Sequence, residues 1–497
     1  MEGPRSGRGR DGHLRRGSRH TRAVRAAAGD HPRAAGRLPA RPGRRDSLGP
    51  RRDGRGDAHP RRACRGGSAR GCAHDPRAAR GPARRARLQR RQHHALPASR
   101  RPGAGAVSSW PIPTPEPLVD VDRARAALAE AGLDALVAHS LQNLFYLSGL
   151  QPLDYLVEAG AIDFAVLPAR PDDPAQVTVP AFGRYMLDDY PLWPPGKVVF
   201  GGFHIAGGPP SASVAGDPIE ALAVACRAAG VPTGRVGFEL EQLPVAVAAR
   251  VRAALPELDL VDASGVLRDL RRRKTSVELE RIRVAGRSLV EAIDEAAGSV
   301  RVDTSEHEIE RRLREALLAR SLEVTSVSLG TGPRGALVWS YPTERRVQAG
   351  EVIRFDITCS YGGYHADLAR TVAVAEASEL DRARYRAIRA SLEAAIGAVR
   401  AGGTCAEVFA AGMRPPREAG LADFDRHNFG HGIGLDVHEA PGLADTDDEI
   451  PVGAALCVES PYYVYGVGAF MAEDMVIVHD DHVERLTVAP TELPVVG

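Results

Sequence analysis

Two pairs of acidic residues in the C-terminal half of the chain have a spacing that could hold metal ions. In EVIRFDITCSYGGYHADLARTVAV, apolar runs flank a Tyr-Gly-Gly-Tyr turn and carry Asp356 and Asp367. If the hairpin is symmetric about the midpoint of these aspartates, between Tyr361 and Gly362, they are directly opposite on one face. Two carboxylates so placed repel each other unless a cation lies between them, so the spacing predicts a cation site.

The segment ALCVESPYYVYGVGAFMAEDMVIV repeats this arrangement. Glu459 and Glu473 are equally far from Gly466, so a second symmetric hairpin would again put two carboxylates face to face. Between the hairpins, HNFGHGIGLDVHEAP places His431 among glycines, which let the backbone approach a ligand closely. Either acidic pair alone would more often be a solvated surface pair. Both lie in apolar runs around a glycine turn, which favours one shared metal site.

Four carboxylates and one imidazole are a donor set for hard to borderline divalent ions. Mn, Fe, Co and Zn fit such a set better than Cu. Two ions bridged by carboxylates can activate a water molecule and polarise a substrate carbonyl. The residues therefore predict a dinuclear site for amide hydrolysis.

The elements that must position these residues fall into two domains. Over 110–268, the apolar runs ALVAHS, DFAVLPA, QVTVPAF, KVVFGGF and RVGFEL alternate with helical patterns, which predicts an α/β domain. Thr275, followed three residues later by a glutamate, is typical of a capping box that opens a long amphipathic helix, and Ser305 opens another. Strand-like segments and a third helical block near 380–400 follow. We therefore expect a second domain, over 269–497, that carries the site.

Residues 1–109 differ in composition from everything that follows. Residues 1–110 contain 29 Arg, no Lys and 7 Asp or Glu, whereas the remainder has 36 basic and 56 acidic residues. Too little apolar surface is available to form a core, so we interpret this extension as disordered. A basic nucleic-acid arm and an Arg-rich transit segment are two explanations. The lack of Ile, Phe, Tyr, Lys and Asn, which have mostly AT-rich codons, favours a third: GC-rich DNA translated from a mis-assigned start.

The sequence carries no signal for a membrane or for secretion. No apolar run is long enough to cross a bilayer, and no apolar core of a signal peptide follows the N-terminus. The six cysteines form no Cys-x-x-Cys pair, so neither a disulfide framework nor a thiolate zinc site is indicated. We therefore expect a cytoplasmic protein.

The five candidate ligands match, in order and type, those of the creatinase/prolidase/aminopeptidase P family of pita-bread metallopeptidases. The phrases DLART, GHGIGLDVHE, AEDMVIV and RRKTSVELERIR resemble that family as well. Upstream, LDALVAHSLQNLFYLSGL resembles the creatinase-type N-terminal domain that aminopeptidase P and prolidase share. The resemblance covers about residues 115–490. It implies an α/β creatinase-type N-terminal domain followed by an α+β pita-bread catalytic domain.

The resemblance also implies a role for each residue of the site. The implied metal ligands are Asp356 on one ion, His431 and Glu459 on the other, and Asp367 and Glu473 as bridges. The cofactors would be two divalent ions, with Mn favoured over Co, Fe or Zn. Glu459 would also shuttle the proton of the attacking water, and His438 would steady the substrate carbonyl or the tetrahedral intermediate. His427 matches either a second pocket histidine or a satisfied core histidine.

Two positions depart from the family pattern. Trp339 stands where the family usually has a histidine, and an indole can donate a hydrogen bond but cannot shuttle a proton. Met471 stands two residues before the last glutamate, where prolidases and aminopeptidase P usually carry an arginine. That arginine would help to hold a peptide's polar or anionic end, which Met cannot do. Both residues are assigned to the substrate pocket, and proline specificity comes from the resemblance alone.

Three functions remain open. The first is a dinuclear metallopeptidase of the Xaa-Pro aminopeptidase or prolidase type, which the ligand set favours. The second is a creatinase-related hydrolase of a small non-peptide amide or zwitterion, which Trp339 and Met471 favour. The third is a non-enzymatic binding protein on the same fold, which the complete ligand set argues against. The expected partner is a small peptide or amide substrate. From the resemblance, we also expect further copies of the chain in a homodimer or larger homo-oligomer. Membranes are not expected as partners, and nucleic acid is disfavoured.

Overall fold

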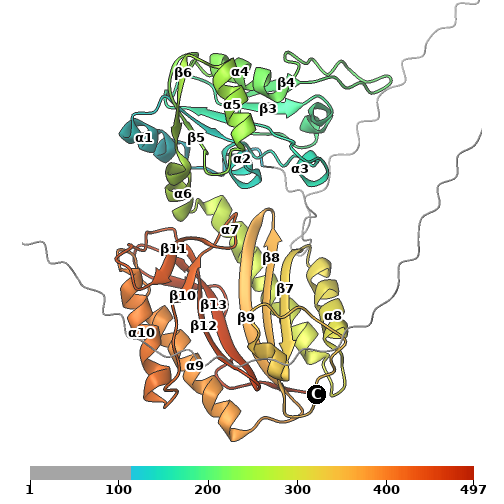
Figure 1. Cartoon of the computed structure of the whole chain (residues 1–497), viewed down its shortest axis with the longest axis vertical. Helices are drawn as coiled ribbons and strands as arrows, with labels where there is room; N and C mark the ends of the chain where they lie inside the picture. Colours follow the sequence, from blue (N-terminus) through green and yellow to red (C-terminus); the bar gives the residue numbers. More distant parts are fainter. Residues whose placement is uncertain (1–113) are drawn as a thin grey trace, which may run out of the picture. The chain divides into compact units, whose positions relative to one another are not determined.

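The computed structural model describes residues 114–497, which belong to one unit of the chain, Ala95–Gly497 (Figure 1). The predicted disordered extension over residues 1–109 lies outside the described residues. Among the helices of residues 114–497, none is long and apolar enough to cross a membrane.

The first part of the described chain is a six-stranded sheet with the order β4-β3-β2-β1-β5-β6. β1, β5 and β6 are parallel to one another, as are β3 and β4, while β2 is antiparallel to both of its neighbours. The strands are β1 (Ala135–Ala138), β2 (Ala165–Pro168), β3 (Gln176–Pro180), β4 (Gly196–Phe200), β5 (Gly234–Phe238) and β6 (Leu258–Asp262). The five strands predicted from the apolar runs are confirmed, and β6 is an addition to them.

Helices cover both faces of this sheet. Leu136 of β1 belongs to the same core as α1 and α6, whereas its neighbour Val137 belongs to the core with α4 and α5. Successive side chains of a strand point to opposite faces, so a strand between two helical layers is apolar throughout. The helices are α1 (Val121–Ala131), α2 (Leu141–Ser148), α3 (Asp154–Val157), the 3-10 helix η1 (Gly183–Asp188), α4 (Pro218–Ala228), α5 (Val245–Ala254) and α6 (Ser264–Arg272).

Polar caps begin the two helices that follow α6. These helices are α7 (Ser276–Gly298) and α8 (Glu306–Ala319). Thr275 Oγ1 accepts a hydrogen bond from the backbone of Glu278, whose carboxylate accepts one from the Thr275 N–H, so the predicted capping box is confirmed. Ser305 caps α8 in the same manner, through the backbone N–H of Glu308. The predicted domain boundary, after residue 268, falls inside α6.

Two further sheets, of four and five strands, form the second part of the chain. Their orders are β15-β9-β8-β7 and β11-β10-β12-β13-β14. The strands are β7 (Glu323–Thr331), β8 (Val352–Tyr361), β9 (Tyr364–Val374), β10 (Asn428–Gly432), β11 (Glu439–Ala444), β12 (Ala455–Val464), β13 (Gly468–Val478), β14 (Val483–Arg485) and β15 (Val495–Val496), with the 3-10 helix η2 (Gly332–Ala336) after β7. The sheets meet at β9 and β13, where Thr371 Oγ1 bonds to the backbone of Met471.

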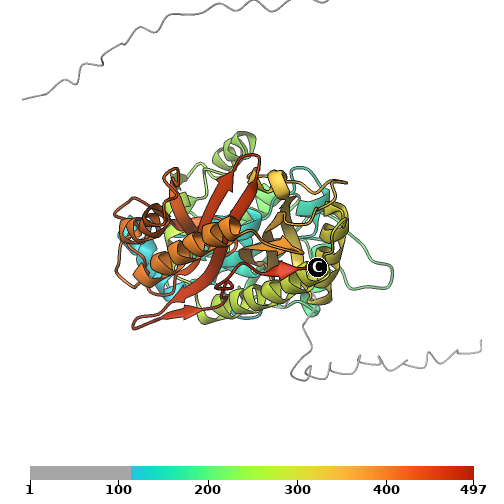
Figure 2. The same ribbon diagram turned by 90° about the horizontal axis from the view of Figure 1, so that it is seen from below.

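Each of these sheets has a pair of helices on its outer face. α7 and α8 contact the four-stranded sheet, while α9 (Glu379–Ala398) and α10 (Cys405–Glu418) contact the five-stranded one. Figure 2 shows the orange helix α9 crossing the red strands β12 and β13. The sequence predicted α9 but not α10, whose last turn contains Pro415 and Pro416. Pro416 has no N–H to donate to the carbonyl of Gly412, so the helix lacks this backbone bond. The carbonyl is still satisfied, because it accepts a hydrogen bond from Ser391 Oγ.

The β8–β9 hairpin has a different register from the predicted one. Gly362 and Gly363 form its turn with φ of 57° and 83°, as a type I′ turn requires at both central positions. Asp356 is therefore opposite Ala369, two residues along from Asp367, and the prediction of directly opposed aspartates was wrong. An offset of two residues keeps both side chains on the same face of the sheet.

The β12–β13 hairpin has the predicted register. Glu459 pairs directly with Glu473, and Gly466 lies in the connecting loop with a φ of 79°. The two hairpins thus present four carboxylates, from β8 and β9 of one sheet and from β12 and β13 of the other.

Candidate metal centre

A cavity of about 780 Å³ contains every site residue singled out from the sequence. It is lined by residues of both sheets and of the loops beside them. The predicted residues at its wall are Trp339, Asp356, Asp367, His427, His431, His438, Glu459, Met471 and Glu473. The structure therefore brings all nine together.

The carboxylates and imidazoles approach closely enough to share ions. Carboxylate oxygens of Asp356, Asp367 and Glu473 lie within 4.8 Å of one another. The same limit holds for ligand atoms of Asp367, His431 and His438. Each of the five candidate ligands comes from a different strand, so the sheets rather than mobile loops fix the geometry.

The four carboxyl groups, of which Asp367 and Glu473 are buried and Asp356 and Glu459 partly buried, lack the positive charge that four neighbouring anions need. Burial, and then the carboxylates of Asp356 and Glu459, raise the pKa of Asp367 well above its usual range. Burial and the neighbouring carboxylates raise the pKa of Glu473 in the same way. Burial also raises the pKa of Asp356 and of Glu459, although an arginine beside each opposes the shift. Divalent cations would supply the missing charge, so this donor set fits a pair of such ions.

His431 has the protonation state of a metal ligand. Burial, and then the neighbouring His438, lower its pKa to about 4, so its imidazole is neutral at pH 7. Nδ1 lies 3.0 Å from the carbonyl oxygen of Gly432, which can only accept, so Nδ1 carries the proton. The lone pair of Nε2 therefore points toward the carboxylates, with Asp367 Oδ2 at 3.9 Å. Metal-binding histidines commonly make such a bond through their other nitrogen.

Gly430 lets the His431 strand lie against β12. A Cβ atom at Gly430 would stand 2.0 Å from the carbonyl oxygen of Cys457, and its φ of 123° is in the region that favours glycine. The glycines of this segment thus serve the close packing of β10, which carries His431.

The residue after His438 is held by two buried cations. Glu439 accepts from Lys274 Nζ at 2.9 Å and from the guanidinium of Arg271. Burial alone would raise the pKa of Glu439, but Lys274 and Arg271 outweigh it and lower the pKa to about 2. Arg271 also bonds to Asp436 at 2.6 Å, so both ends of the Asp436–Glu439 turn are fixed.

The same arginine connects this turn to the first sheet. Arg271 Nη1 donates to Asn143 Oδ1 at 3.1 Å, and Asn143 Nδ2 donates to the carboxylate of Glu239 at 2.6 Å. Asn143, Glu239 and Arg271 are all buried. A continuous buried polar chain therefore runs from β5 and α2 to the residue next to His438.

Arg354 lies behind Asp356 with every side-chain nitrogen bonded. Nη1 donates to Asp356, and Nε donates to the carbonyl of Gly335 at 3.1 Å. Nη2 donates to the carbonyls of Leu337 and Val338 at 2.8 and 3.0 Å, and to Ser328 Oγ. Arg354 thus ties the first aspartate to the loop that leads to Trp339.

The two residues that depart from the family pattern have different surroundings. Trp339 is 81% exposed at the edge of the cavity, where its side chain can reach a substrate but is not packed in a pocket. Met471 is buried on β13. The Arg354 guanidinium on β8 bonds to Asp356 instead of facing the cavity, which it does not line.

Two arginines at the site were not predicted from the sequence: Arg354, and Arg426, whose Nη2 lies 3.7 Å from Glu459 Oε1. A signal for Arg354 was available. It is a charged residue inside the apolar run EVIRFDI, two positions from Asp356 and hence on the same face. No comparable pattern marks Arg426, because it lies in the irregular segment before β10.

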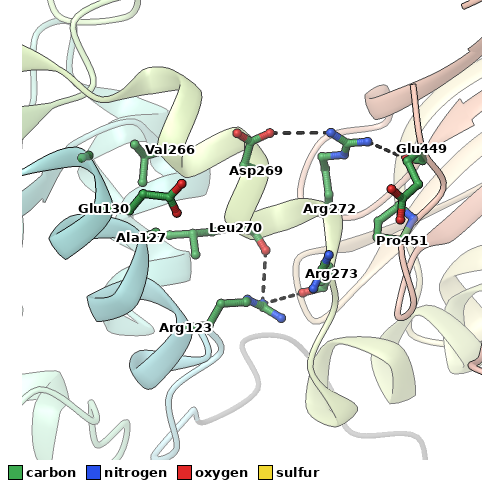
Figure 3. A pocket seen from close by; sticks show the side chains of 11 residues that line it. Arg123, Ala127, Glu130, Val266, Asp269, Leu270, Arg272, Arg273, Glu449 and Pro451 are labelled. Atoms are coloured by element: carbon green, nitrogen blue, oxygen red, sulfur yellow. Dashed lines mark hydrogen bonds and ion pairs between the residues drawn. The ribbon is translucent and has the colours of Figure 1, made fainter. Parts of the chain in front are cut away.

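A second cavity, of about 630 Å³, lies between α1, α6 and the segment around Glu449 (Figure 3). Two of its arginine side chains are hydrogen-bonded within the protein. Arg123 donates to the carbonyls of Leu270 and Arg273, and Arg272 donates to the carbonyl of Glu449. None of the predicted site residues lines it, so we assign no chemistry to this cavity.

Comparison with known proteins identifies the fold and the family. The model of metallopeptidase family M24 matches residues 280–480, and that of the creatinase/prolidase N-terminal domain matches residues 121–273. The probable dipeptidase PepE of Mycobacterium tuberculosis is 34% identical over 277 residues, which are 53% of this chain and 74% of that protein. The Xaa-Pro dipeptidase of Lactobacillus delbrueckii subsp. lactis is 29% identical over 262 residues, or 52% of this chain and 71% of that one.

A solved structure has the same arrangement of domains. The dipeptidase PepE of Mycobacterium ulcerans superimposes with a TM-score of 0.60 at 28% identity, over 76% of this chain and 96% of that one. The expected creatinase-type domain followed by a pita-bread domain is thus confirmed, and membership of the family implies divalent metal ions. The chain belongs to metallopeptidase family M24 and is a peptidase with a creatinase/prolidase-type N-terminal domain.

Proposed function

We propose that the protein uses two divalent ions, with Mn²⁺ the first choice, to cleave the peptide bond before proline in dipeptides or at the N-terminus of longer peptides. The observation that carries this proposal is the group of four carboxyl groups, two buried and two partly buried, with raised pKa values around a neutral histidine. The relatives, a dipeptidase and an Xaa-Pro dipeptidase, support the choice of substrate. We also propose that the domains divide as 110–268 and 269–497.

In this proposal, the residues that hold the ions are Asp356, Asp367, His431, Glu459 and Glu473. When bound, the ions would supply the positive charge that activates water and polarises the scissile carbonyl. Glu459 takes the proton of the attacking water and passes it to the leaving amine.

His438 and its neighbours handle the developing negative charge. His438 donates a hydrogen bond to the oxygen of the scissile carbonyl as that oxygen becomes negative. The Glu439 ion pairs fix the backbone that carries His438, so its ring needs little reorganisation during the reaction. His427, at the cavity wall, and Trp339, at its edge, contact the substrate. Trp339 donates a hydrogen bond only.

A second candidate is a hydrolase of a small non-peptide amide or zwitterion. Trp339 is the observation that favours it, because the exposed indole replaces a histidine that can shuttle protons. Trp339→His should increase the rate of peptide hydrolysis if a missing proton shuttle limits it. An unchanged rate would favour a pocket built for the smaller amide. A cytoplasmic location and assembly into homo-oligomers stay predictions.

The decisive experiment measures hydrolysis of Ala-Pro and Ala-Pro-Ala by the Mn²⁺-loaded protein, with chelator-treated protein as the reference. We expect metal-dependent release of alanine, and His431→Ala should lose nearly all of it together with bound metal. His307→Ala is the matched control, since His307 is half exposed and pairs with Glu344 far from the cavity wall. A folded, metal-loaded protein that cleaves neither peptide would refute the proline-peptidase proposal and favour the small amide.

A further inference from the structure

Arg426 presents a guanidinium to the cavity without any hydrogen bond. Its side chain is only 10% exposed, and its Nε is buried without a partner. The nearest anionic atom is Glu459 Oε1, 3.7 Å from Nη2, which is an ion pair but too long for a hydrogen bond. Among residues 114–497, none accepts a hydrogen bond from this guanidinium. A buried donor left unsatisfied costs free energy unless a ligand completes it.

Arg426 differs in this respect from the other cations near the site. Arg354 is fully bonded and lies behind Asp356, and Lys274 is paired with Glu439. Of the described residues that line the cavity, Arg426 is the one lysine or arginine. If two divalent ions balance the four carboxylates, Arg426 leaves the loaded cavity with a surplus positive charge. The surplus favours a substrate that carries an anionic group beside its scissile bond.

The segment that carries Arg426 is anchored on both sides. Phe424 is buried against Phe429 and Tyr462, with ring centroids 6.3 and 6.2 Å apart. The hydroxyl of Tyr462 donates to Asp423 at 2.8 Å. The guanidinium is therefore positioned before the substrate arrives, which lowers the entropic cost of binding.

We propose that Arg426 binds the C-terminal carboxylate of a dipeptide substrate and so makes the enzyme a dipeptidase rather than an aminopeptidase. This inference rests on the proposed function, because Glu459 marks the place of the scissile bond. Consecutive Cα atoms are about 3.8 Å apart, so one residue beyond that bond brings its carboxylate to the guanidinium. The carboxylate of a tripeptide would lie one residue too far. Arg–carboxylate pairs are commonly bidentate, which suits the two Nη groups of Arg426, neither of which has a hydrogen bond to the described residues.

The test compares Ala-Pro with its amide, Ala-Pro-NH₂, which differs in the charge of the C-terminus alone. The Mn²⁺-loaded wild type should prefer the free acid by roughly 10- to 100-fold in kcat/KM, the range for a charge-assisted hydrogen bond. Arg426→Met should remove this preference, chiefly through a higher KM for Ala-Pro, and Arg426→Lys should keep part of it. Arg417→Met is the control, because Arg417 is exposed and pairs only loosely with Asp425 at 3.9 Å. Circular dichroism and thermal unfolding verify that each variant is folded.

A binding measurement separates this inference from the proposed function. Calorimetry with L-proline and L-prolinamide reports recognition of the carboxylate without turnover. A wild type that binds proline more tightly, with the difference lost in Arg426→Met, supports the inference even if neither peptide is cleaved. The inference would be overturned if the wild type showed equal kcat/KM and equal affinity for the acid and the amide, or if the preference for the acid survived in Arg426→Met. Either result would leave the peptidase activity in place.

Discussion

Glu439→Gln should destabilise the protein far more than loss of an ordinary surface ion pair. Glu439 is a buried carboxylate between Lys274 and Arg271, and its pKa is lowered to about 2. The gap between that value and the ordinary value of 4.5 corresponds to roughly 3 kcal/mol of preference for the charged form in the folded protein. Glutamine keeps the shape but leaves Lys274, whose side chain is 1% exposed, without its counter-ion. Breaking a buried pair in this way costs about 3–5 kcal/mol, which agrees with the first figure.

The pH dependence gives this prediction its sign. The folded-state pKa of Glu439 lies below the unfolded value, so its stabilisation is complete above pH 4.5 and is lost as pH falls through about 2. Denaturant unfolding of the wild type and Glu439→Gln should therefore differ by about 3 kcal/mol at pH 7 and converge toward pH 2. Glu315→Gln is the matched control. It removes an exposed pair with Arg311 and should cost less than about 1 kcal/mol.

Activity provides a second readout of the same change. Because Glu439 follows His438 directly, loss of its ion pairs should lower kcat more than it raises KM. A free energy of unfolding within about 1 kcal/mol of wild type at pH 7, or a difference that persists unchanged to pH 2, would refute the reasoning.

Three further predictions follow from the packing around the cavity. Arg354→Met should weaken metal binding about 10- to 100-fold in a chelator competition, because it frees the Asp356 carboxylate, and unchanged affinity would contradict the role of Arg354. Gly430→Ala should cost about 3 kcal/mol or more in thermal unfolding, because its Cβ would meet the carbonyl of Cys457, and a smaller loss would mean that β10 can shift. Chelator-treated protein should be less stable at about pH 8 than at about pH 5. The raised pKa values of its buried carboxyl groups mean that the folded protein holds protons which the unfolded chain has lost, so stability falls as pH rises. A lower melting temperature at the acidic pH would contradict this.

Much of the fold and the candidate ligand set could be predicted because both depend on local periodicity. Glu459 and Glu473 were expected to face each other because both are equally far from Gly466. The structure pairs them directly. In the first hairpin, the centre of the turn was predicted between Tyr361 and Gly362 but lies one residue later. The positive φ angles of Gly362 and Gly363 fix these two residues as the turn. An error of this kind shifts partners by two residues and leaves the face unchanged.

The residues that were missed depend on contacts between distant segments. Arg354 has carbonyl partners at 335, 337 and 338, which reach it only through the path of the loop after β7. Arg426 is notable for the partner that it lacks, and no one-dimensional pattern reports a missing partner. α10 was overlooked because two prolines argue against a helix, and the compensating hydroxyl of Ser391 belongs to another helix.

The hydrogen-bonded chain from Glu239 through Asn143 and Arg271 to Glu439 bears on how this enzyme can be recombined. Its bonds join residues up to 168 positions apart in the sequence, the largest separation being that between Arg271 and Glu439. A chimaera that takes its first domain from one relative and its second from another will preserve the histidine loop only if both parents supply matching polar groups at the junction. Arg271 and Glu439 should therefore change together during divergence, and Asn143 with them.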